Sequence, residues 1–343
     1  MALSGYLATS VVYLGIYVLA CWAMNLQYGL TGIYNLAFIL FQAAGAYTEA
    51  VLTLGPSSGN GAFQQYILGY SLPFPIPMLA GALVGGVLSL IVGLVVLRRL
   101  RSDYQAVTML TLSVMATLLV TSVVPLFNGP AGLSLVPQPL VNTFNTSNVT
   151  YSWIYGGICA GFCVIAYFFV YRITSSPLGR ALRTVRENDS AAAALGKNVN
   201  ALRLFSFVVG GAIAGLSGAL LVGYIGAWAP SSWAYTETIV VLTAVIVGGS
   251  GNDAGALLGA LLIPVVVVQG STFLPQFGPP ELVPGLQWIM IGLLGLIFVY
   301  YWPRGIIPER RRRFPEEIGP APALAAPPAE SAPHAPPQGG TDH

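Results

Sequence analysis

The stretch Pro177–Arg203, PLGRALRTVRENDSAAAALGKNVNALR, is a charged segment between two long apolar runs. Its sequence predicts two short helices with a break between them. Pro177 suits a first helical turn, residues 181–186 have high helix propensity, and Gly196 followed by Asn198 is a stop signal. A short polar helix between apolar runs cannot be buried in lipid, so we expect it to face water or another protein. The alternative is an ordinary positively charged loop that only fixes topology.

The composition of the chain is that of an integral membrane protein. Of its 343 residues, 55% are hydrophobic and only 8% are charged, and the mean hydropathy is +0.73. Ordinary soluble domains carry about a quarter charged residues. From Met1 to Leu97 the only Asp, Glu, Lys, Arg or His side chain is that of Glu49. The sequence therefore predicts an all-α fold, a polytopic bundle of transmembrane helices.

About nine apolar segments are long enough, or nearly so, to cross a bilayer. Their approximate centres are Ile16, Gln42, Leu88, Val114, Gly161, Ile213, Leu242, Leu262 and Leu293. We expect them to form one transmembrane domain over residues 1–305. The stretch 236–270 is ambiguous, because its two apolar segments are short and a glycine-rich run lies between them. It fits either two full spans or a broken, partly re-entrant pair.

The positive charges orient this domain. All 14 Lys and Arg residues fall within residues 98–101, 172–203 and 304–313. The positive-inside rule places all three groups in the cytoplasm. Two predicted spans separate the first pair of groups and four separate the second, which agrees with that placement. We therefore expect the N-terminus outside, the C-terminus in the cytoplasm, and residues 172–203 in a cytoplasmic loop.

The last part of the chain has a different composition. Residues 306–343 are rich in Pro and Ala and contain little apolar bulk after Phe314. Such a segment cannot bury enough apolar surface to build a core. We expect it to be a disordered cytoplasmic tail.

The sequence lacks the patterns that carry enzyme chemistry. It has no Walker A sequence for ATP phosphates, no paired carboxylates, no Ser/His/Asp set and no metal-ligand cluster. Both histidines, His334 and His343, lie in the tail, and the three cysteines have no zinc or redox spacing. We therefore expect no enzyme activity, no metal or cofactor in this chain, and no nucleic-acid partner.

Two sets of glycines recur at helical spacing. The first is Gly251, Gly255 and Gly259, and the second is Gly211, Gly215 and Gly218. Stripes of small residues let two membrane helices approach closely, so we interpret both as helix-packing surfaces. Contact with a transported substrate is the alternative.

Polar residues inside the second apolar segment are candidates for a translocation path. Asn35 and Gln42 are predicted to lie two helical turns apart, and Gln42 and Glu49 to lie along roughly the same face. Polar groups in a membrane need partners or a wet path. A neutral polar stripe with one acid suits a small zwitterionic or amide-bearing solute. The alternative is hydrogen bonding between helices, without contact to substrate.

Four passages together resemble one known family. They are YGLTGIYNLAFILFQAAGAYTEAVL at 28–52, SSPLGRALRTVRENDSAAAALGKNVNALRLFSFVVGGAIAGLSGALL at 175–221, VIVGGSGNDAGALLGALL at 245–262 and YYWPRGI at 300–306. The chain looks like the LivM-type permease subunits of the branched-chain amino acid ABC importers. The likeness extends over most of the membrane domain and leaves out the Pro/Ala-rich tail.

The resemblance implies a passive half of a transport channel in a prokaryotic plasma membrane. Its partners would be a homologous second permease of the LivH type, two cytoplasmic ATPase subunits that bind the ATP, and an extracytoplasmic solute-binding protein. Residues 189–196 would be the loop that docks into an ATPase. Ser190 stands at the family's acidic position, with Asp189 one residue earlier. The residues that the resemblance assigns to this docking loop are Arg180, Arg183, Arg186, Asp189, Ala191, Ala192, Gly196 and Lys197.

The substrate is left open by the sequence. The resemblance implies import of branched-chain or other neutral amino acids, and relatives of this family also handle urea, short amides and aromatic acids. A self-sufficient secondary transporter or channel is the alternative from another class. Such a protein usually needs buried acids or bases for its coupling ions, and this membrane domain offers few.

Overall fold

A computed structural model describes residues 2–56, 64–141, 148–273 and 282–309 of the chain. In these ranges the secondary structure is helical, apart from two isolated β-bridges, Tyr66–Phe127 and Leu133–Trp228. The elements in chain order are α1 (Ala2–Met24), η1 (Asn25–Gly29), α2 (Phe38–Thr53), α3 (Ile76–Arg99), α4 (Ser102–Ser122), α5 (Val124–Phe127), η2 (Gly129–Ala131), α7 (Asn148–Ser175), α8 (Pro177–Glu187), α9 (Asp189–Ala194), α10 (Val199–Ile225), η3 (Pro230–Trp233), α11 (Tyr235–Gly248), α12 (Asp253–Ala260), η4 (Leu261–Gln269), η5 (Gly270–Phe273) and α13 (Leu282–Tyr301).

Seven helices in the described part of the chain are long and apolar enough to cross a membrane. They are Ser4–Gly29, Ile76–Arg99, Tyr104–Ser122, Asn148–Ser175, Val199–Ile225, Pro230–Gly248 and Leu282–Tyr301. The predicted polytopic helical bundle is confirmed. The other two predicted centres lie in shorter helices, Gln42 in the 16-residue α2 and Leu262 in the apolar helix Asp253–Gln269. At 1.5 Å per residue, α2 is about 24 Å long, less than the roughly 30 Å of a hydrocarbon core.

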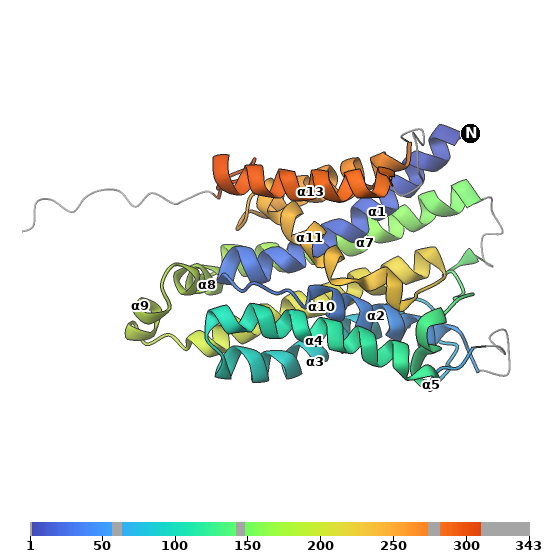
Figure 1. Cartoon of the computed structure of the whole chain (residues 1–343), viewed down its shortest axis with the longest axis horizontal. Coiled ribbons are helices and arrows are strands. Elements are labelled where there is room, and N and C mark those ends of the chain that lie inside the picture. Colours follow the sequence, from blue (N-terminus) through green and yellow to red (C-terminus); the bar gives the residue numbers. More distant parts are fainter. Residues whose placement is uncertain (1, 57–63, 142–147, 274–281, 310–343) are drawn as a thin grey trace, which may run out of the picture. The chain divides into compact units, whose positions relative to one another are not determined.

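The helices run alongside one another, and their ends gather at two opposite ends of the bundle (Figure 1). Helices α8 and α9 lie at one end, together with the end of η1, where Arg186 hydrogen-bonds the Gly29 carbonyl. The N-terminus lies at the other end. We refer to these as the α8–α9 end and the opposite end.

Three helices, α2, α3 and α10, pack through glycines at their shared contact. A Cβ on Gly81 of α3 would lie 2.9 Å from the Gly45 carbonyl oxygen of α2, and one on Gly215 of α10 would lie 2.5 Å from the Gly81 carbonyl oxygen. A Cβ on Gly218 would overlap the Gln42 carbonyl of α2. These backbones touch directly, which only glycine permits. The predicted stripe of Gly211, Gly215 and Gly218 therefore lies at this three-helix contact.

The ambiguous stretch 236–270 consists of two helices joined by a tight turn. Helix α11 ends at Gly248, and α12 begins at Asp253 and continues as the π-helix η4, which contains Pro264. Gly255 packs on α11, since its Cβ would lie 2.7 Å from the Gly248 carbonyl oxygen, and Gly259 packs on the Ala244 carbonyl.

Gly251 does not share the stripe that its spacing predicted. It precedes α12 and has φ +84°, so it belongs to the turn and not to the helix face. The four-residue spacing gave the wrong expectation here because the helix starts two residues after this glycine.

We predict that Gly215→Leu destabilises the bundle. The new side chain must separate α10 from α3, and overpacking of this kind costs about 1–3 kcal/mol. The measurement is the fraction of detergent-purified protein that stays monodisperse after heating. Gly161→Leu in α7 is the matched control, because a Cβ there meets no atom within 4 Å. Equal heat resistance of the two variants would contradict the packing interpretation.

Candidate functional site: the α8–α9 segment

Two side-chain caps divide the charged segment into its two helices. Ser176 accepts a hydrogen bond from the Gly179 amide and starts α8, with Pro177 in the first turn. Asn188 leaves the helical conformation, which ends α8, and its side chain accepts from the Ala191 amide to start α9. Such caps satisfy amides that have no partner within the helix. The break between the two helices therefore lies at Asn188.

Gly196 closes α9 with a left-handed residue. Its φ is +75°, its amide bonds to the Ala193 carbonyl at 2.9 Å, and the Lys197 amide bonds to the Ala192 carbonyl at 3.1 Å. This pair of bonds is the Schellman motif, in which glycine avoids the steric cost of a Cβ. The sequence-based stop signal at Gly196 coincides with this turn.

The eight residues that the resemblance assigned to docking divide between two faces. Arg180, Ala191, Gly196 and Lys197 are exposed, and Leu195 beside them has 72% of its surface exposed. Arg183, Arg186 and Asp189 are half-buried and form ion pairs within the chain.

Ala192 is fully buried against its own chain. It is therefore not a surface contact in this structure, contrary to its place among the docking residues. The reason is the break at Asn188, which turns α9 so that the middle alanine faces inward while Ala191 and Ala193 face out.

The two inward arginines of α8 share one carboxylate. Glu309 lies 2.5 Å from Arg183 Nε and 2.6 Å from Arg186 Nη2, and its side chain is only 19% exposed. Arg186 Nη1 also donates to the Gly29 carbonyl at the end of η1. We call these three side chains, Arg183, Arg186 and Glu309, the Glu309 cluster. It links α8 to the end of η1 and to the chain after α13.

The turn between α11 and α12 packs on the same cluster. A Cβ on Gly251 would lie 2.8 Å from Arg186 Nη1 and 2.8 Å from Glu309 Oε2. The Gly251 amide donates to Asn25 Oδ1 at 2.8 Å. A side chain at position 251 would collide with the Glu309 cluster. This close approach, and not helix packing, explains why a glycine occurs here.

Asp253, the first residue of α12, is the second polar centre at this end. It accepts hydrogen bonds from Thr174 Oγ1 at 2.9 Å and from Asn25 Nδ2 at 3.3 Å. Its backbone carbonyl accepts from Trp22 Nε1 at 2.9 Å. Arg183 Nη1 donates to the Thr174 carbonyl at 3.2 Å, so the Asp253 contacts continue into the Glu309 cluster.

Residues 306–309 belong to this meeting point. The amides of Ile306 and Ile307 donate to the carbonyls of Val247 and Gly248 at 2.9 and 3.0 Å. The compact unit that contains the helices ends at Glu309, whereas the sequence analysis began the tail at residue 306. Sequence reasoning missed Glu309. The available signal is weak: Glu309 is an acid directly before the basic run 310–313, and Glu316 and Glu317 lie close behind that run.

A further ion pair holds α9. Arg203 Nη2 of α10 lies 2.6 Å from Asp189 Oδ2 at the start of α9. Asp189 also stands in the first turn of its helix, where a negative charge is favourable. Both short helices are therefore tied to the bundle by charge, α8 through Glu309 and α9 through Arg203.

The three path candidates lie in different settings. Asn35 precedes α2, which begins at Phe38, so it does not continue the helix face of Gln42. It caps the chain locally, accepting from the Ala37 amide at 3.0 Å and donating to Gln27 Oε1 at 2.7 Å. The prediction that Asn35 and Gln42 share a helix face is wrong, because Gly32, with φ +71°, breaks the helix before Asn35.

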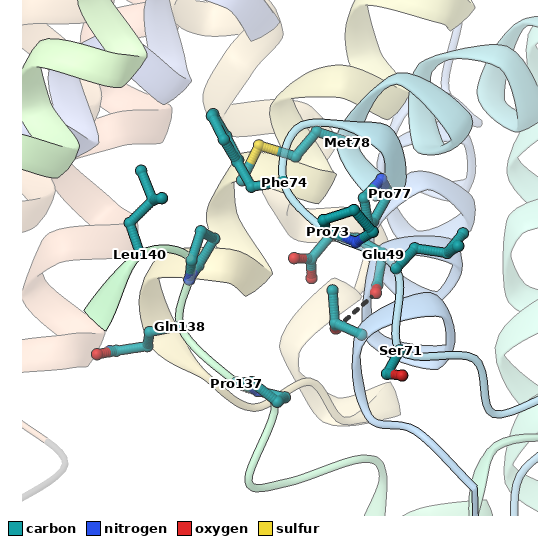
Figure 2. A pocket seen from close by; sticks show the side chains of 12 residues that line it. Glu49, Ser71, Pro73, Phe74, Pro77, Met78, Pro137, Gln138 and Leu140 are labelled. Atoms are coloured by element: carbon teal, nitrogen blue, oxygen red, sulfur yellow. Dashed lines mark hydrogen bonds between the residues drawn. The ribbon is translucent and has the colours of Figure 1, made fainter. Parts of the chain in front are cut away.

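Gln42 and Glu49 do lie on α2. Gln42 is buried where α10 approaches at Gly218. Glu49, two turns further on, is fully buried and lines a cavity at the opposite end (Figure 2). The described residues contain no group of three or more His, Cys, Asp or Glu side chains placed to hold a metal ion.

Comparison with known proteins gives the family. The model of the branched-chain amino acid transport system permease component matches residues 6–299. The chain belongs to this family. It is therefore a multi-pass membrane protein of a bacterial and archaeal transporter family, a transport component and not an enzyme, and the family works without a cofactor.

Individual relatives of the permease span both bacteria and archaea. The chain is 28% identical to the high-affinity branched-chain amino acid transport permease LivM of Escherichia coli, covering 86% of this chain and 68% of that one. It is 25% identical to a probable LivM of Methanocaldococcus jannaschii, covering 87% and 92%. It is 32% identical to the high-affinity branched-chain amino acid transport permease LivH of Salmonella typhimurium over a shorter alignment, which covers 30% of this chain and 33% of that one. No solved structure matches.

We predict that Glu309→Gln loosens α8. The substitution removes the charge shared by Arg183 and Arg186, and a hydrogen bond to a charged group is worth about 1.5–3 kcal/mol before solvent screening reduces it. Hydrogen exchange of the purified permease should rise several-fold in peptides covering residues 177–187 and 248–253.

The matched control for this prediction is Glu187→Gln. Glu187 is an exposed acid on α8 itself and forms none of the ion pairs described above. Its removal should leave exchange in both peptides unchanged. Equal exchange in the two variants would show that the Glu309 cluster does not restrain α8.

Proposed function

We propose that the permease is the membrane-spanning subunit of an ATP-driven importer for branched-chain or other neutral amino acids. It forms half of the translocation path and is driven by an ATPase partner that docks on residues 177–203. The observation that carries the proposal is the exposed surface of α9 and of the turn that ends it, formed by Ala191, Leu195 and Lys197. The opposite side of α9 is tied to the bundle by the Asp189–Arg203 ion pair. A positively charged loop that only fixes the membrane topology needs neither an exposed leucine nor a rigid support.

The arrangement of the ends supports a cytoplasmic α8–α9 end. Helix α3 runs antiparallel to α10, since Gly81 packs near Ala219 and Gly93 packs near Leu204. Arg98 and Arg99 at the end of α3 therefore lie at the same end as the start of α10. Arg172, in the last turn of α7, precedes α8 directly. The basic residues thus gather at one end, as the positive-inside rule requires for a cytoplasmic face.

In this proposal the chain crosses the membrane nine times, with the N-terminus outside and residue 309 inside. The short α2 counts as a span because it is enclosed by other helices. Residues 30–37 before it are mostly buried in protein, where irregular backbone is tolerated at membrane depth. The helix Asp253–Gln269 counts as the eighth crossing.

The family implies ATPase and binding-protein partners. We propose a heteromeric complex of this permease, a homologous LivH-type permease, two cytoplasmic ATPases and an extracytoplasmic binding protein. Closure of the ATPases on ATP would move α8 and α9 inward and switch the path between outward and inward access. The Glu309 cluster supports this role, because it joins α8 to the ends of η1 and of the α11–α12 turn.

A secondary transporter or channel has less support. Its coupling ions would need acids or bases within the spans. Glu49 and Glu237 are the acids that stand inside the described crossings, with Asp253 at the first residue of α12. None of the three forms an ion pair among the described residues.

We predict that residue 190 is cytoplasmic and residue 131 extracytoplasmic. In a background without Cys21, Cys159 and Cys163, single cysteines replace Ser190 or Ala131, which are both exposed. A membrane-impermeant thiol reagent added to intact cells should label residue 131 and label residue 190 only after permeabilisation. The reverse pattern would overturn the topology.

We predict that Leu195→Asp uncouples transport from ATP. If Leu195 docks into an apolar groove of an ATPase, the aspartate that replaces it places an unpaired charge in that groove. This should lower ATP-dependent uptake at least tenfold. The complex is assayed in proteoliposomes for uptake and for ATP hydrolysis stimulated by the loaded binding protein. Leu195→Met keeps the apolar bulk and should retain most activity.

Ala192→Trp is unsuitable for the same purpose, because Ala192 is buried within this chain and a large side chain there would disrupt α9 itself. Accumulation of solute by the permease without ATP, or full coupling in Leu195→Asp, would contradict the docking proposal.

A further inference from the structure

A cavity of about 410 Å³ opens at the opposite end of the bundle, away from α8 and α9. Its walls come from the second half of α2, the segment 71–78 that leads into α3, and residues 137–140 (Figure 2). The volume lies within the range of about 300–1,000 Å³ that is usual for small-molecule sites. In the topology proposed above, this cavity faces the extracytoplasmic side, where a binding protein delivers its solute.

Glu49 is the charged residue of this cavity. Its side chain has no exposed surface, and neither carboxylate oxygen has a hydrogen-bond partner among the residues that the structure describes. Figure 2 shows the carboxylate pointing from α2 toward the space between Phe74 and residues 137–140. A buried carboxylate without partners is costly, and such an exception in a folded protein calls for a missing partner.

The neighbouring donors are already used. The Thr53 hydroxyl donates to the backbone carbonyls of Glu49 and Ala50. The Tyr155 hydroxyl, which is close to Glu49 through the gap left by Gly223, donates to the Leu220 carbonyl at 2.7 Å. Among the described residues, no Lys, Arg or His lines the cavity. This part of the chain therefore supplies no counter-charge for Glu49, and the cavity is the direction from which one can come.

The other residues that line the cavity indicate what kind of solute can carry the positive charge that pairs with Glu49. Phe74, Met78, Leu72 and Leu140 give apolar walls, and four prolines make the surrounding segments stiff. The other polar side chains of the lining, Ser71 and Gln138, are exposed, and the Gln138 amide donates to the Tyr224 carbonyl at 2.8 Å. This lining suits a solute with a cationic head and an aliphatic body. It disfavours an anion such as an aromatic acid. A neutral amide could donate a hydrogen bond to Glu49 but would leave the charge of the carboxylate uncompensated.

We propose that this cavity is an entry site for an aliphatic α-amino acid, whose ammonium group pairs with the Glu49 carboxylate. The proposal rests on the importer function proposed above and deepens it by assigning a binding site and a counter-ion for the ammonium group of the transported amino acid. The aliphatic side chain packs against Phe74 and Met78, and the substrate carboxylate turns away from Glu49 toward the exposed rim, where Ser71 stands. Glu49 thus serves as a positional counter-ion for the substrate and undergoes no chemistry.

The test measures occupancy of the cavity directly in the intact complex. Leu72→Cys, in the cysteine-free background, places a thiol on the cavity wall without altering its polar groups. The complex in nanodiscs, without binding protein, is treated with a membrane-impermeant maleimide in the presence of millimolar L-leucine, isopentylamine or 4-methylpentanoate. The amine keeps the ammonium group and the acid keeps the carboxylate, while both keep the aliphatic body.

We expect L-leucine and isopentylamine to slow labelling of residue 72 and 4-methylpentanoate to have no effect. Glu49→Gln keeps the shape and removes the charge, so it should weaken protection by leucine roughly tenfold or more. Glu237→Gln is the matched control. Glu237 is a half-buried acid in the first turn of α11, whose start lies at the same end, and it does not line the cavity. Its substitution should leave protection unchanged.

Two results would overturn the proposal: equal protection by the acid and the amine, or undiminished protection by leucine in Glu49→Gln. The first comparison uses the unaltered Glu49 and therefore holds even where Glu49→Gln assembles poorly. ATP-dependent uptake of L-leucine with the binding protein is measured on the same complex. If ATP-dependent uptake persists but the expected protection is not seen, only the entry-site proposal is wrong. If ATP-dependent uptake is absent, the proposed importer function itself is wrong.

Discussion

Direct contact between the backbones of α2, α3 and α10 is the constraint on which the rest of the bundle depends. Lipid tails are as apolar as leucine, so helices in a membrane gain little from burying apolar surface against each other and associate through close packing instead. Glycines at 45, 81 and 215 provide that packing, because a Cβ on any of them would collide with a neighbouring backbone atom. The same contact fixes α2, and thereby places Gln42 deep in the bundle and Glu49 beside the cavity.

Several buried polar side chains in the bundle form hydrogen bonds to another helix or to its backbone, whereas the Glu49 carboxylate forms none with the residues that the structure describes. Gln27 donates to the Phe207 carbonyl and accepts from Asn35, and Thr238 accepts from the Ile39 amide. These side chains fasten α1, α2, α10 and α11 where helical hydrogen bonding is interrupted, which is how membrane proteins accommodate irregular backbone. Glu49 lies on a regular stretch of α2, so its missing partners do not arise from such a repair. That difference is the reason to assign it to a ligand.

Local sequence signals predicted much of this arrangement, and the rest depends on tertiary contacts. Apolar runs located the helices, Pro177 marked the start of α8 and Gly196 the end of α9, whereas the cap at Asn188 that separates the two helices was not predicted. Asn35 and Gly251 were placed on helix faces by spacing alone, but each stands just before the first helical residue, and a shift of two residues moves a side chain off its face. The pairing of Glu309 with two arginines of α8 has no local signature, because it depends on how segments over a hundred residues apart meet. The inward turn of Ala192 follows from the break at Asn188, which the sequence analysis did not locate.

The two candidate sites lie at opposite ends of the bundle, and the packing limits how one can influence the other. Interfaces as close as that of α2, α3 and α10 cannot deform gradually, so motion between the ends must be carried by helices that move as rigid bodies. The Glu309 cluster joins α8 to η1, which continues directly from α1, and to the turn that starts α12. Helix α10 begins at that same end and passes Gly223 beside Glu49 at the other. A push on α8 therefore has two mechanical routes, through α1 and through α10. Of these, α10 carries Gly223 directly beside Glu49, whereas α1 reaches that region through Tyr224 of α10, whose hydroxyl pairs with Thr9. We therefore expect coupling between docking and the cavity to run through α10 and its glycine contact with α2.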